Sequence, residues 1–269
     1  MQRIIDQIIE GSGLSKSALA ARSGLARSTQ YRIRDGLVDP AIGTVRELAL
    51  AAGFELVLSL APLSDPDAAR AARVILDPLY EASYVLTQHG LTTGTTGEAK
   101  KVDEWVERLR RWVPDGNPVD IVSQAGQSSS LLHRPGTVFL RGHVTELKLA
   151  SAGDFSQQEW LISGAAVIDR IGVPDDEGAL YGGALPGTSA CPYIVHTADT
   201  HRFARLLDNM ETVRPNKANL IIAEYTAGVE VDSWEDGKIK LAAPIQGLLD
   251  AFGIRGALGI AAERIARSW

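Results

Sequence analysis

The stretch from Leu14 to Gly53 constrains the fold more than any other part of the chain, because it predicts a set of short helices around one sharp turn. Ser15 is a candidate N-cap, and the apolar residues that follow it keep helical spacing. Gly24 supplies the turn, and a second short helix is expected from about Arg27 to Asp35. Two short helices joined in this way are typical of a helix-turn-helix, a motif that places side chains against DNA.

The expected second helix has two distinct faces, because successive side chains are about 100° apart around the helix axis. The inward face carries Thr29, Gln30 and Ile33. The outward face carries Arg27, Ser28, Tyr31 and Arg32. Guanidinium groups, a hydroxyl and a phenol suit guanine edges, phosphates and thymine methyl groups. We therefore expect the outward face to be the recognition face.

Two segments carry a family likeness, ALAARSGLARSTQYRIRDG and DPAIGTVRELALAAGFEL. In them the first 60 residues, roughly, resemble the Cro/repressor-like (Xre-family) helix-turn-helix domain. The resemblance implies that Lys16 and Ser17 meet phosphate, and that the outward face of the second helix meets bases and backbone. Ala26 stands where the family usually has a capping Ser or Thr, and Gln30 where an apolar residue usually packs inward; at the groove edge Gln30 would enlarge the reading face. The expected DNA-binding residues are Lys16, Ser17, Arg27, Ser28, Gln30, Tyr31, Arg32 and Arg34.

The composition is that of folded globular domains, with 45% hydrophobic and 22% charged residues, and 269 residues suffice for one large or two ordinary domains. No apolar run approaches the roughly 20 residues of a membrane span, and the N-terminal MQRIIDQIIEG lacks the pattern of a signal peptide. The one cysteine, Cys191, has no partner for an internal disulfide, which agrees with a reducing compartment. We therefore expect a cytoplasmic protein with no membrane segment.

The net charge of −6 is unfavourable for a DNA-binding protein until it is divided along the chain. Residues 1–60 hold seven Arg or Lys and six Asp or Glu, a net of +1, which leaves −7 for the remainder. Screening confines charge effects to about 8–10 Å, so Lys16, Arg27, Arg32 and Arg34 can still form a local basic face. The alternative interpretation of residues 1–60 is a helical packing or dimerisation domain without affinity for DNA.

We expect a multi-domain fold in three parts. Residues 1–62 form an all-α helix-turn-helix domain, residues 63–117 a helical connector, and residues 118–269 a mixed α/β (α+β) domain. Within the connector, Pro66 signals a helix start and Pro78 an interruption. In the last part, strands are expected over 119–132, 137–150, 191–197, 218–225 and 228–234. Helices are expected over 155–173 and from about Ile245 to the C-terminus.

Three segments of residues 118–269 carry a second family likeness, in the positions of their apolar residues and glycines. They are WLISGAAVIDRIGV, then YIVHTADTHRFARLL with ANLIIAEYTAGV, and above all APIQGLLDAFGIRGALGIAAERI. In this pattern the chain resembles the C-terminal domain of AbiEi-like antitoxins, the transcriptional regulators of type IV toxin–antitoxin systems. The resemblance implies neutralisation of a cognate nucleotidyltransferase-like toxin. Many members of that family carry a winged helix where this chain has an Xre-like motif.

No catalytic or metal-binding set emerges from the remaining residues. His196 and His201 flank Asp199. The two histidines are five residues apart, whereas a metal-binding pair on one helix face is three or four residues apart. An ordinary strand-to-helix junction, with Asp199 as a candidate N-cap, is therefore the better interpretation of this segment. Glu230 and Asp232 alternate as the carboxylates of a nucleotidyltransferase would, but no Gly-Ser loop precedes them. We expect no enzyme activity, no metal and no cofactor.

The sequence thus predicts a sequence-specific DNA-binding transcriptional regulator, an antitoxin that represses its own operon. Its expected partners are operator double-stranded DNA, a second copy of the chain as a homodimer, and a cognate nucleotidyltransferase-like toxin. The dimer is expected because one small helix-turn-helix makes few base contacts and needs two half-sites. Two alternatives stay open: a repressor whose second domain senses a small molecule, and a nucleotidyltransferase-like enzyme that carries a DNA-binding head.

Overall fold

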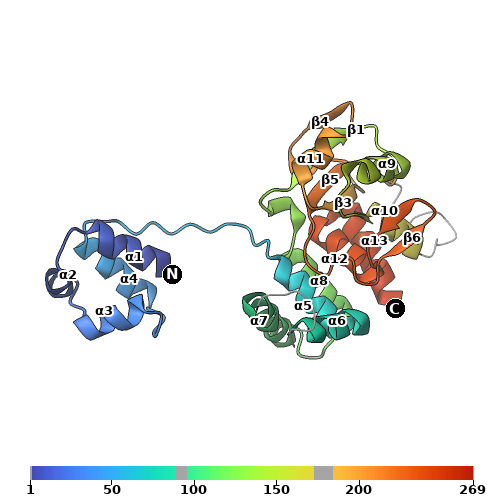
Figure 1. Ribbon diagram of the computed structural model, residues 1–269. Helices are drawn as coiled ribbons and strands as arrows, with labels where there is room; N and C mark the ends of the chain where they lie inside the picture. Colours follow the sequence, from blue (N-terminus) through green and yellow to red (C-terminus); the bar gives the residue numbers. More distant parts are fainter. Residues whose placement is uncertain (1, 89–95, 173–183, 269) are drawn as a thin grey trace. The chain divides into compact units, whose positions relative to one another are not determined.

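The computed structural model describes residues 2–88, 96–172 and 184–268. The chain divides into two compact units, Met1–Ala61 and Pro62–Trp269 (Figure 1). Among the described residues, the first unit is all helical, and the second combines helices with one seven-stranded sheet. The expected connector, residues 63–117, lies within the second unit and contributes α5 (Pro66–Leu76), α6 (Pro78–Gln88) and α7 (Thr96–Trp112).

The helices of the first unit are α1 (Gln2–Gly11), α2 (Lys16–Ser23), α3 (Arg27–Arg34) and α4 (Ile42–Ala51). Their buried side chains meet in one small apolar core, which contains Ile5, Ile8, Leu19, Ile33, Val45 and Leu48. The expected start of α2 is confirmed, because Ser15 Oγ accepts a hydrogen bond from the backbone N–H of Ala18 at 3.2 Å. The helix ends at Gly24, whose φ of 68° lies in the left-handed region that favours glycine.

The sheet of the second unit has the strand order β4–β1–β5–β3–β2–β7–β6. The strands are β1 (Val138–Gly142), β2 (Trp160–Gly164), β3 (Tyr193–Thr197), β4 (Met210–Thr212), β5 (Leu220–Glu224), β6 (Trp234–Asp236) and β7 (Ile239–Leu241). The pairs β3–β5 and β2–β7 are parallel, and the other four pairs are antiparallel. Helices and a mixed sheet in one unit agree with the α+β class expected for this part of the chain.

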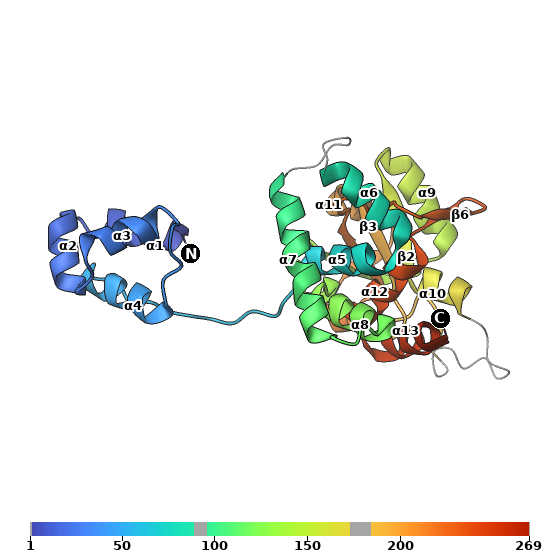
Figure 2. The same ribbon diagram turned by 90° about the horizontal axis from the view of Figure 1, so that it is seen from below.

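Helices cover both faces of this sheet (Figure 1). On one face, α9 (Glu146–Ser156) and α11 (Thr200–Arg205) pack around Leu149 and Phe203. The other face is covered by α12 (Pro244–Ile254), against which pack α5, α8 (Pro118–Ser128) and α13 (Gly256–Ser268). In Figure 2, α5, α7 and α8 lie side by side in this outer layer. Every residue of α12 from Ile245 through Gly253 is buried, so α12 is the central element of the unit.

The prediction of a strand over 119–132 is wrong, because α8 occupies most of this segment. Asn117 Oδ1 accepts hydrogen bonds from two backbone N–H groups of the first turn, and Pro118 stands at the first helical position, so both residues favour a helix start. Gly126 lets α8 approach α12 closely, since a Cβ there would lie 2.5 Å from the carbonyl oxygen of Leu249. The apolar run that suggested a strand is the buried face of a helix.

Two further expectations differ from the structure. The predicted strand over 137–150 contains β1, but its second half begins α9, because Thr145 Oγ1 accepts a hydrogen bond from the backbone N–H of Lys148 at 3.3 Å. The predicted helix over 155–173 contains β2 and only then a short helix, α10 (Ala165–Ile171). β2 is buried throughout, so it lacks the alternation of polar and apolar residues that marks a half-exposed strand.

Other expected elements are confirmed. The strands predicted over 191–197 and 218–225 contain β3 and β5, and Pro66 begins α5. Pro78 begins α6, and only Asp77 lies between it and the end of α5. The predicted closing helix is two helices, α12 and α13, which meet at Arg255 with a positive φ of 65°. Two 3₁₀ turns complete the described elements, η1 (Leu131–His133) and η2 (Pro215–Lys217).

The substitution Gly153→Ala tests the packing of α9 on the sheet. A Cβ at position 153 would lie 2.3 Å from the buried indole ring of Trp160. Overpacking of this kind costs about 1–3 kcal/mol, so we expect urea unfolding, followed by tryptophan fluorescence, to show that loss of stability. Gly259→Ala in α13 is the matched control, because its nearest neighbour would lie 3.5 Å away and a helical alanine is favoured over glycine. Equal effects of the two substitutions would contradict the packing described.

Candidate nucleic-acid interface

Positive charge gathers on two neighbouring helices of the first unit. We define the basic segment as residues 16–34, which span α2, the turn and α3. It contains five cationic residues and no Asp or Glu, namely Lys16, Arg22, Arg27, Arg32 and Arg34. The six acidic residues of the first unit all lie outside it, at Asp6, Glu10, Asp35, Asp39, Glu47 and Glu55. The near-neutral charge of the unit therefore conceals a strongly basic segment.

Most of these cations are not neutralised by carboxylates. Lys16, Arg22, Arg27 and Arg32 are exposed, and none of them forms an ion pair with a residue in the described part of the chain. Arg34 does have such a neighbour, with its Nε 3.0 Å from Oδ1 of Asp35. Exposed cationic groups without a bound carboxylate can form charge-assisted hydrogen bonds with phosphate oxygens.

Side chains of α2 and α3 meet at two places in the basic segment. Ser17 Oγ accepts a hydrogen bond from Nη2 of Arg27. Lys16 Nζ donates a hydrogen bond to Tyr31 Oη at 3.2 Å, and the Arg34 guanidinium carbon lies 4.9 Å from the centroid of the same ring. The hydrogen bond and the charge of Lys16 lower the pKa of Tyr31, which is 44% exposed. Five of the expected DNA-binding residues thus form contacts with one another on the surface.

The expected DNA-binding residues are at the surface with one exception. Ser28 and Arg32 are exposed, like Lys16, Ser17, Arg27 and Tyr31, and Arg34 is half-buried. Gln30 is only 7% exposed, and its Nε2 donates a hydrogen bond to Ser23 Oγ at 3.2 Å. The expectation that Gln30 lies at the groove edge is therefore corrected. A buried amide needs a hydrogen-bond partner, and Ser23 supplies one that holds α3 against α2.

α3 begins without a side-chain cap. Ala26 occupies the N-cap position and makes no side-chain hydrogen bond. The first backbone N–H groups of any α-helix lack partners within the helix, and the helix dipole makes this end positive. Arg27 stands at the same end, so the start of α3 combines outward N–H groups with a guanidinium. This combination suits an oxyanion such as a DNA phosphate.

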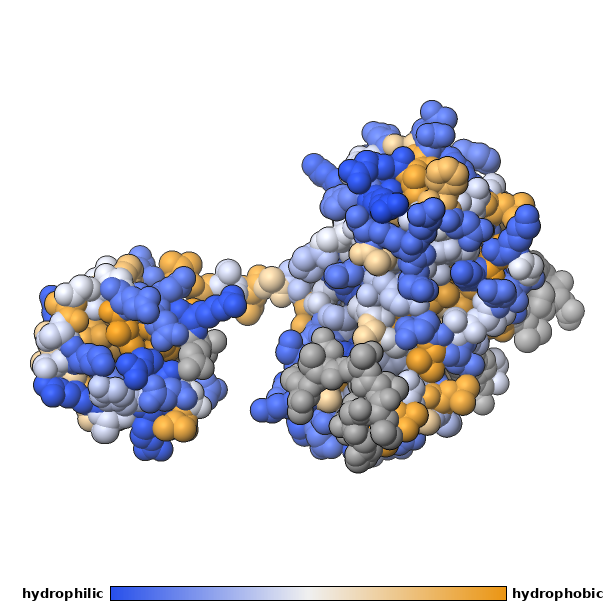
Figure 3. Space-filling model, in the orientation of Figure 1, coloured by the Kyte–Doolittle hydropathy of each residue, from blue (hydrophilic) through white to orange (hydrophobic). Residues whose placement is uncertain are grey.

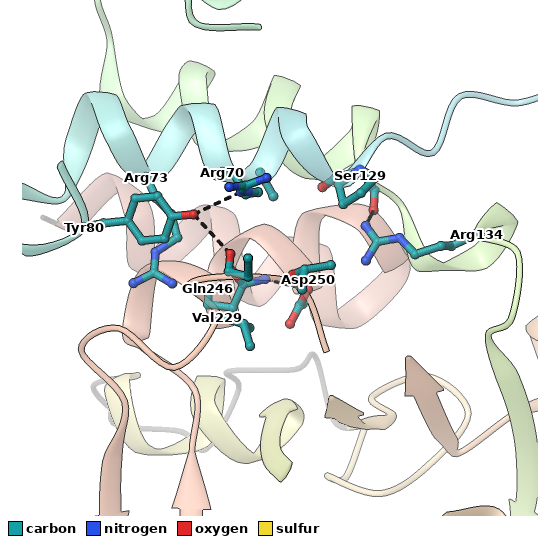
Figure 4. Close-up of a pocket in the computed structure, with 12 residues that line it drawn as sticks. Arg70, Arg73, Tyr80, Ser129, Arg134, Val229, Gln246 and Asp250 are labelled. Atoms are coloured by element: carbon teal, nitrogen blue, oxygen red, sulfur yellow. Dashed lines mark hydrogen bonds between the residues drawn. The ribbon is translucent and has the colours of Figure 1, made fainter. Parts of the chain in front are cut away.

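A polar pocket lies in the second unit, between α5, α12 and the loop after β5 (Figure 4). Its lining includes Arg70, Arg73, Tyr80, Ser129, Arg134, Gln246 and Asp250. Arg70 donates hydrogen bonds to Asp67 Oδ1 at 2.9 Å and to Tyr80 Oη at 3.3 Å. Arg73 is 1% exposed and is bound by Asp77 and by two backbone carbonyls of the loop. These two guanidinium groups hold the pocket walls together.

Asp250, on α12, is the centre of a buried polar cluster. Its Oδ2 accepts a hydrogen bond from Ser163 Oγ at 2.6 Å and lies 2.8 Å from His196 Nε2. Its Oδ1 accepts a hydrogen bond from Gln246 Nε2 at 3.1 Å. Burial raises the pKa of Asp250, but the charge and hydrogen bond of His196 and the hydrogen bond of Ser163 outweigh burial and lower it overall. An ionised carboxylate therefore joins α12 to β2 and β3.

The geometry of this cluster assigns it a role in holding α12 on the sheet. A serine nucleophile is activated by a direct hydrogen bond to a base such as histidine. Here Ser163 and His196 both bind the same oxygen of Asp250, and all three side chains are buried. Sequence reasoning missed the cluster. The one signal was a single carboxylate, with Gln246 one turn before it, in the mostly apolar helix of residues 244–254.

Other residues considered in the sequence have ordinary structural roles. The predicted strand over 228–234 is wrong, because Glu230 and Asp232 lie in turns before β6. The alternating carboxylates of a nucleotidyltransferase strand are therefore not formed there. Asp199 is the N-cap of α11, since its Oδ1 accepts a hydrogen bond from a backbone N–H of the first turn at 2.8 Å. Burial raises the pKa of the Cys191 thiol to about 11, so little reactive thiolate exists at neutral pH.

Comparison with protein-family models, with curated proteins and with solved structures found no match to this chain. No helix within residues 2–88, 96–172 and 184–268 is both long and apolar enough to cross a membrane. In this described part, no three His, Cys, Asp or Glu side chains gather as metal ligands would. The candidate interface therefore rests on the geometry and charge of the first unit itself.

Asp250→Asn tests the buried cluster, because it removes the charge and keeps the size of the side chain. Removing one partner of a buried pair costs about 3–5 kcal/mol, so we expect the free energy of unfolding at pH 7 to fall by that order. The folded-state pKa of Asp250 is lowered, so its contribution to stability is present above the unfolded pKa of about 3.9 and is lost as the pH falls below it. Urea unfolding should show the difference from wild type shrinking at acid pH.

Asp154→Asn, on the exposed side of α9, is the matched control for Asp250→Asn. Its effect on the free energy of unfolding should stay within about 0.5 kcal/mol, as is usual for surface positions. A difference between wild type and Asp250→Asn that persists unchanged down to about pH 3 would contradict an ionised carboxylate in the cluster.

Proposed function

We propose that this chain is a sequence-specific DNA-binding transcriptional regulator, in which α2, the turn at Gly24 and α3 form a helix-turn-helix. The observation that carries the proposal is the basic segment, which has five cationic residues and no carboxylate on two short helices packed together. Duplex DNA carries dense negative charge and attracts such a surface. Its major groove admits one α-helix, and α3 is short and exposed along one side.

In this proposal α3 is the recognition helix. Arg27 and Arg32 pair with guanine edges or phosphates, and Ser28 and Tyr31 contact bases and backbone between them. Lys16 and Ser17, at the start of α2, meet the phosphate backbone together with Arg34, the last residue of α3. The resemblance of residues 1–60 to the Xre-family domain implies the same assignment for all of these residues except Arg34, which is added for its charge. Gln30 is left out of it, because its side chain is buried.

We assign the regulator to the antitoxin class on the resemblance of residues 118–269 to AbiEi-like antitoxins. The second unit then serves for dimerisation, for neutralisation of a nucleotidyltransferase-like toxin, or for both, and the chain represses its own operon in the cytoplasm. Co-expression with the neighbouring reading frame tests this part. Growth arrest by that frame alone, relieved by this chain, supports the antitoxin role. Arrest that persists with this chain present contradicts that role and leaves DNA binding untouched.

Arg27→Ala and Arg32→Ala test the recognition face. Each substitution should weaken binding to the promoter of the chain's own gene by about 1–3 kcal/mol if the guanidinium contacts a base, which is roughly a 5- to 150-fold rise in Kd. Fluorescence anisotropy with promoter DNA, and with a scrambled duplex as reference, measures the change.

Arg46→Ala is the matched control, because it removes the same charge from the same unit but lies on α4, outside the basic segment. It should lose much less affinity than either recognition variant. If Arg27→Ala and Arg32→Ala both bind like wild type, the proposed recognition face is wrong.

A further inference from the structure

The polar pocket of the second unit contains a cation without a paired carboxylate. Every residue that lines this pocket, from Pro66 to Asp250, belongs to the second unit. On the face of this unit drawn in Figure 3, hydrophilic and apolar residues are interspersed, as is usual for a protein surface. A pocket lined by three arginines differs from such a surface, and Arg134 is the one of the three that forms no ion pair with a described residue.

Most of the N–H groups of Arg134 have no protein acceptor. The residue directly follows η1, and its guanidinium points into the pocket from the right-hand side of Figure 4. Nη2 donates a hydrogen bond to the backbone carbonyl oxygen of Ser129 at 2.6 Å. Nε is buried and has no partner in the described part of the chain, and Nη1 makes no hydrogen bond there either. A guanidinium carries five N–H donors, so this one is largely unsatisfied by the protein.

The carboxylates that act on Arg134 do so from a distance. They are Asp250, Asp65 and Glu224, and none of them forms an ion pair with it. Asp250 is held by the buried polar cluster, and Asp65 Oδ2 accepts a hydrogen bond from the indole N–H of Trp105 at 2.8 Å. Burial lowers the pKa of Arg134, and the three carboxylates offset only part of this effect. The protein therefore compensates the charge of Arg134 incompletely.

Arg70 offers a second set of donors to the same pocket. Its Nη1 and Nε are bound to Asp67 and Tyr80, but its Nη2 makes no hydrogen bond to a residue that the structure describes. Arg73 differs, because its Nε, Nη1 and Nη2 are all bound, to Asp77 and to loop carbonyls. Two guanidinium groups with unused N–H donors therefore line one pocket, and the third is part of its wall.

We propose that this pocket binds the carboxylate group of a small monoanionic ligand, with Arg134 as the main contact and Arg70 as the second. A carboxylate is planar and matches the fork of N–H groups on a guanidinium, so the hydrogen bonds between them are charge-assisted and strong. The inference goes beyond the proposed function and does not rest on it. A small-molecule site in the second unit is what a ligand-sensing repressor, the alternative that the sequence leaves open, would need.

Charge and size restrict the ligand. Asp67 and Asp77 pair with two of the lining arginines, and Asp250 lines the pocket itself. A monoanion supplies the one charge that Arg134 lacks, whereas a dianion such as phosphate would bring a second negative charge close to Asp250, and like charges repel. The pocket holds about 310 Å³ of empty space, counting the part open to solvent, which suits a carboxylate on a short aliphatic chain.

Titration of the full chain with propionate, followed by saturation-transfer NMR, tests the site. Wild type should bind propionate, and its midpoint of thermal unfolding should rise with propionate concentration at constant ionic strength, because a ligand that binds only the folded chain stabilises it. n-Propanol has the same aliphatic chain without the charge, and it should bind about tenfold or more weakly. Inorganic phosphate should also bind more weakly than propionate, because of its second charge.

Variants of the two arginines assign the contact. Arg134→Met removes the guanidinium and keeps a long side chain, so it should weaken propionate binding about tenfold or more. Arg70→Lys keeps a cation beside Asp67 but loses Nη2, and it should weaken binding by a smaller factor. Arg110→Met is the matched control, because it removes an exposed guanidinium of α7, outside the pocket, and it should bind propionate like wild type.

Four results would overturn the inference. Wild type that does not bind propionate, or that binds n-propanol as tightly, has no carboxylate site. Tighter binding of phosphate than of propionate contradicts the choice of a monoanion. If Arg134→Met keeps the helix content of wild type by circular dichroism and binds propionate equally well, Arg134 is not the contact. If Arg134→Met does not fold, Arg70→Lys decides, and unchanged affinity for propionate in that variant contradicts the site. None of these measurements uses DNA, so their failure leaves the recognition face untouched.

Discussion

The second unit depends on the burial of α12 between the sheet and three other helices. Apolar packing alone tolerates small shifts of one element against another, whereas an ionised carboxylate buried without a partner costs several kcal/mol. Asp250 is the only acidic residue of α12, and Ser163 of β2 and His196 of β3 bind it. This polar contact therefore specifies which strands α12 covers and how the helix is rotated upon them.

The two units differ in whether their charged side chains have partners, and the proposed function is based on this difference. In the second unit the deeply buried charges have polar partners: Asp250 has Ser163 and His196, and Arg73 has Asp77 and loop carbonyls. In the first unit, four exposed cations of the basic segment have no carboxylate partner among the described residues. Unpaired surface cations do not stabilise the folded monomer, but they remain able to bind phosphate.

The first unit was largely predictable because its signals are local. Ser15 and Gly24 mark the ends of α2 within a few residues, and the spacing of the outward side chains of α3 follows from helix geometry alone. Gln30 stands where the Xre family usually has an apolar residue, and this departure suggested a place at the groove edge. It is buried instead because Ser23, on another helix, satisfies it. In the second unit, β2 and α8 were assigned wrongly, since fully buried strands and buried helix faces give similar short apolar runs.

The sequence by itself determined the boundaries of α2 and α3 and the separation of the cations of residues 16–34 from the carboxylates of the first unit. These properties depend on residue types and on spacing within a few turns of chain. Only the tertiary structure decided the strand order and the meeting of Ser163, His196 and Asp250. Their distance along the chain is bridged by contacts between strands and helices, and no local pattern of residue types encodes which distant partner satisfies a buried charge.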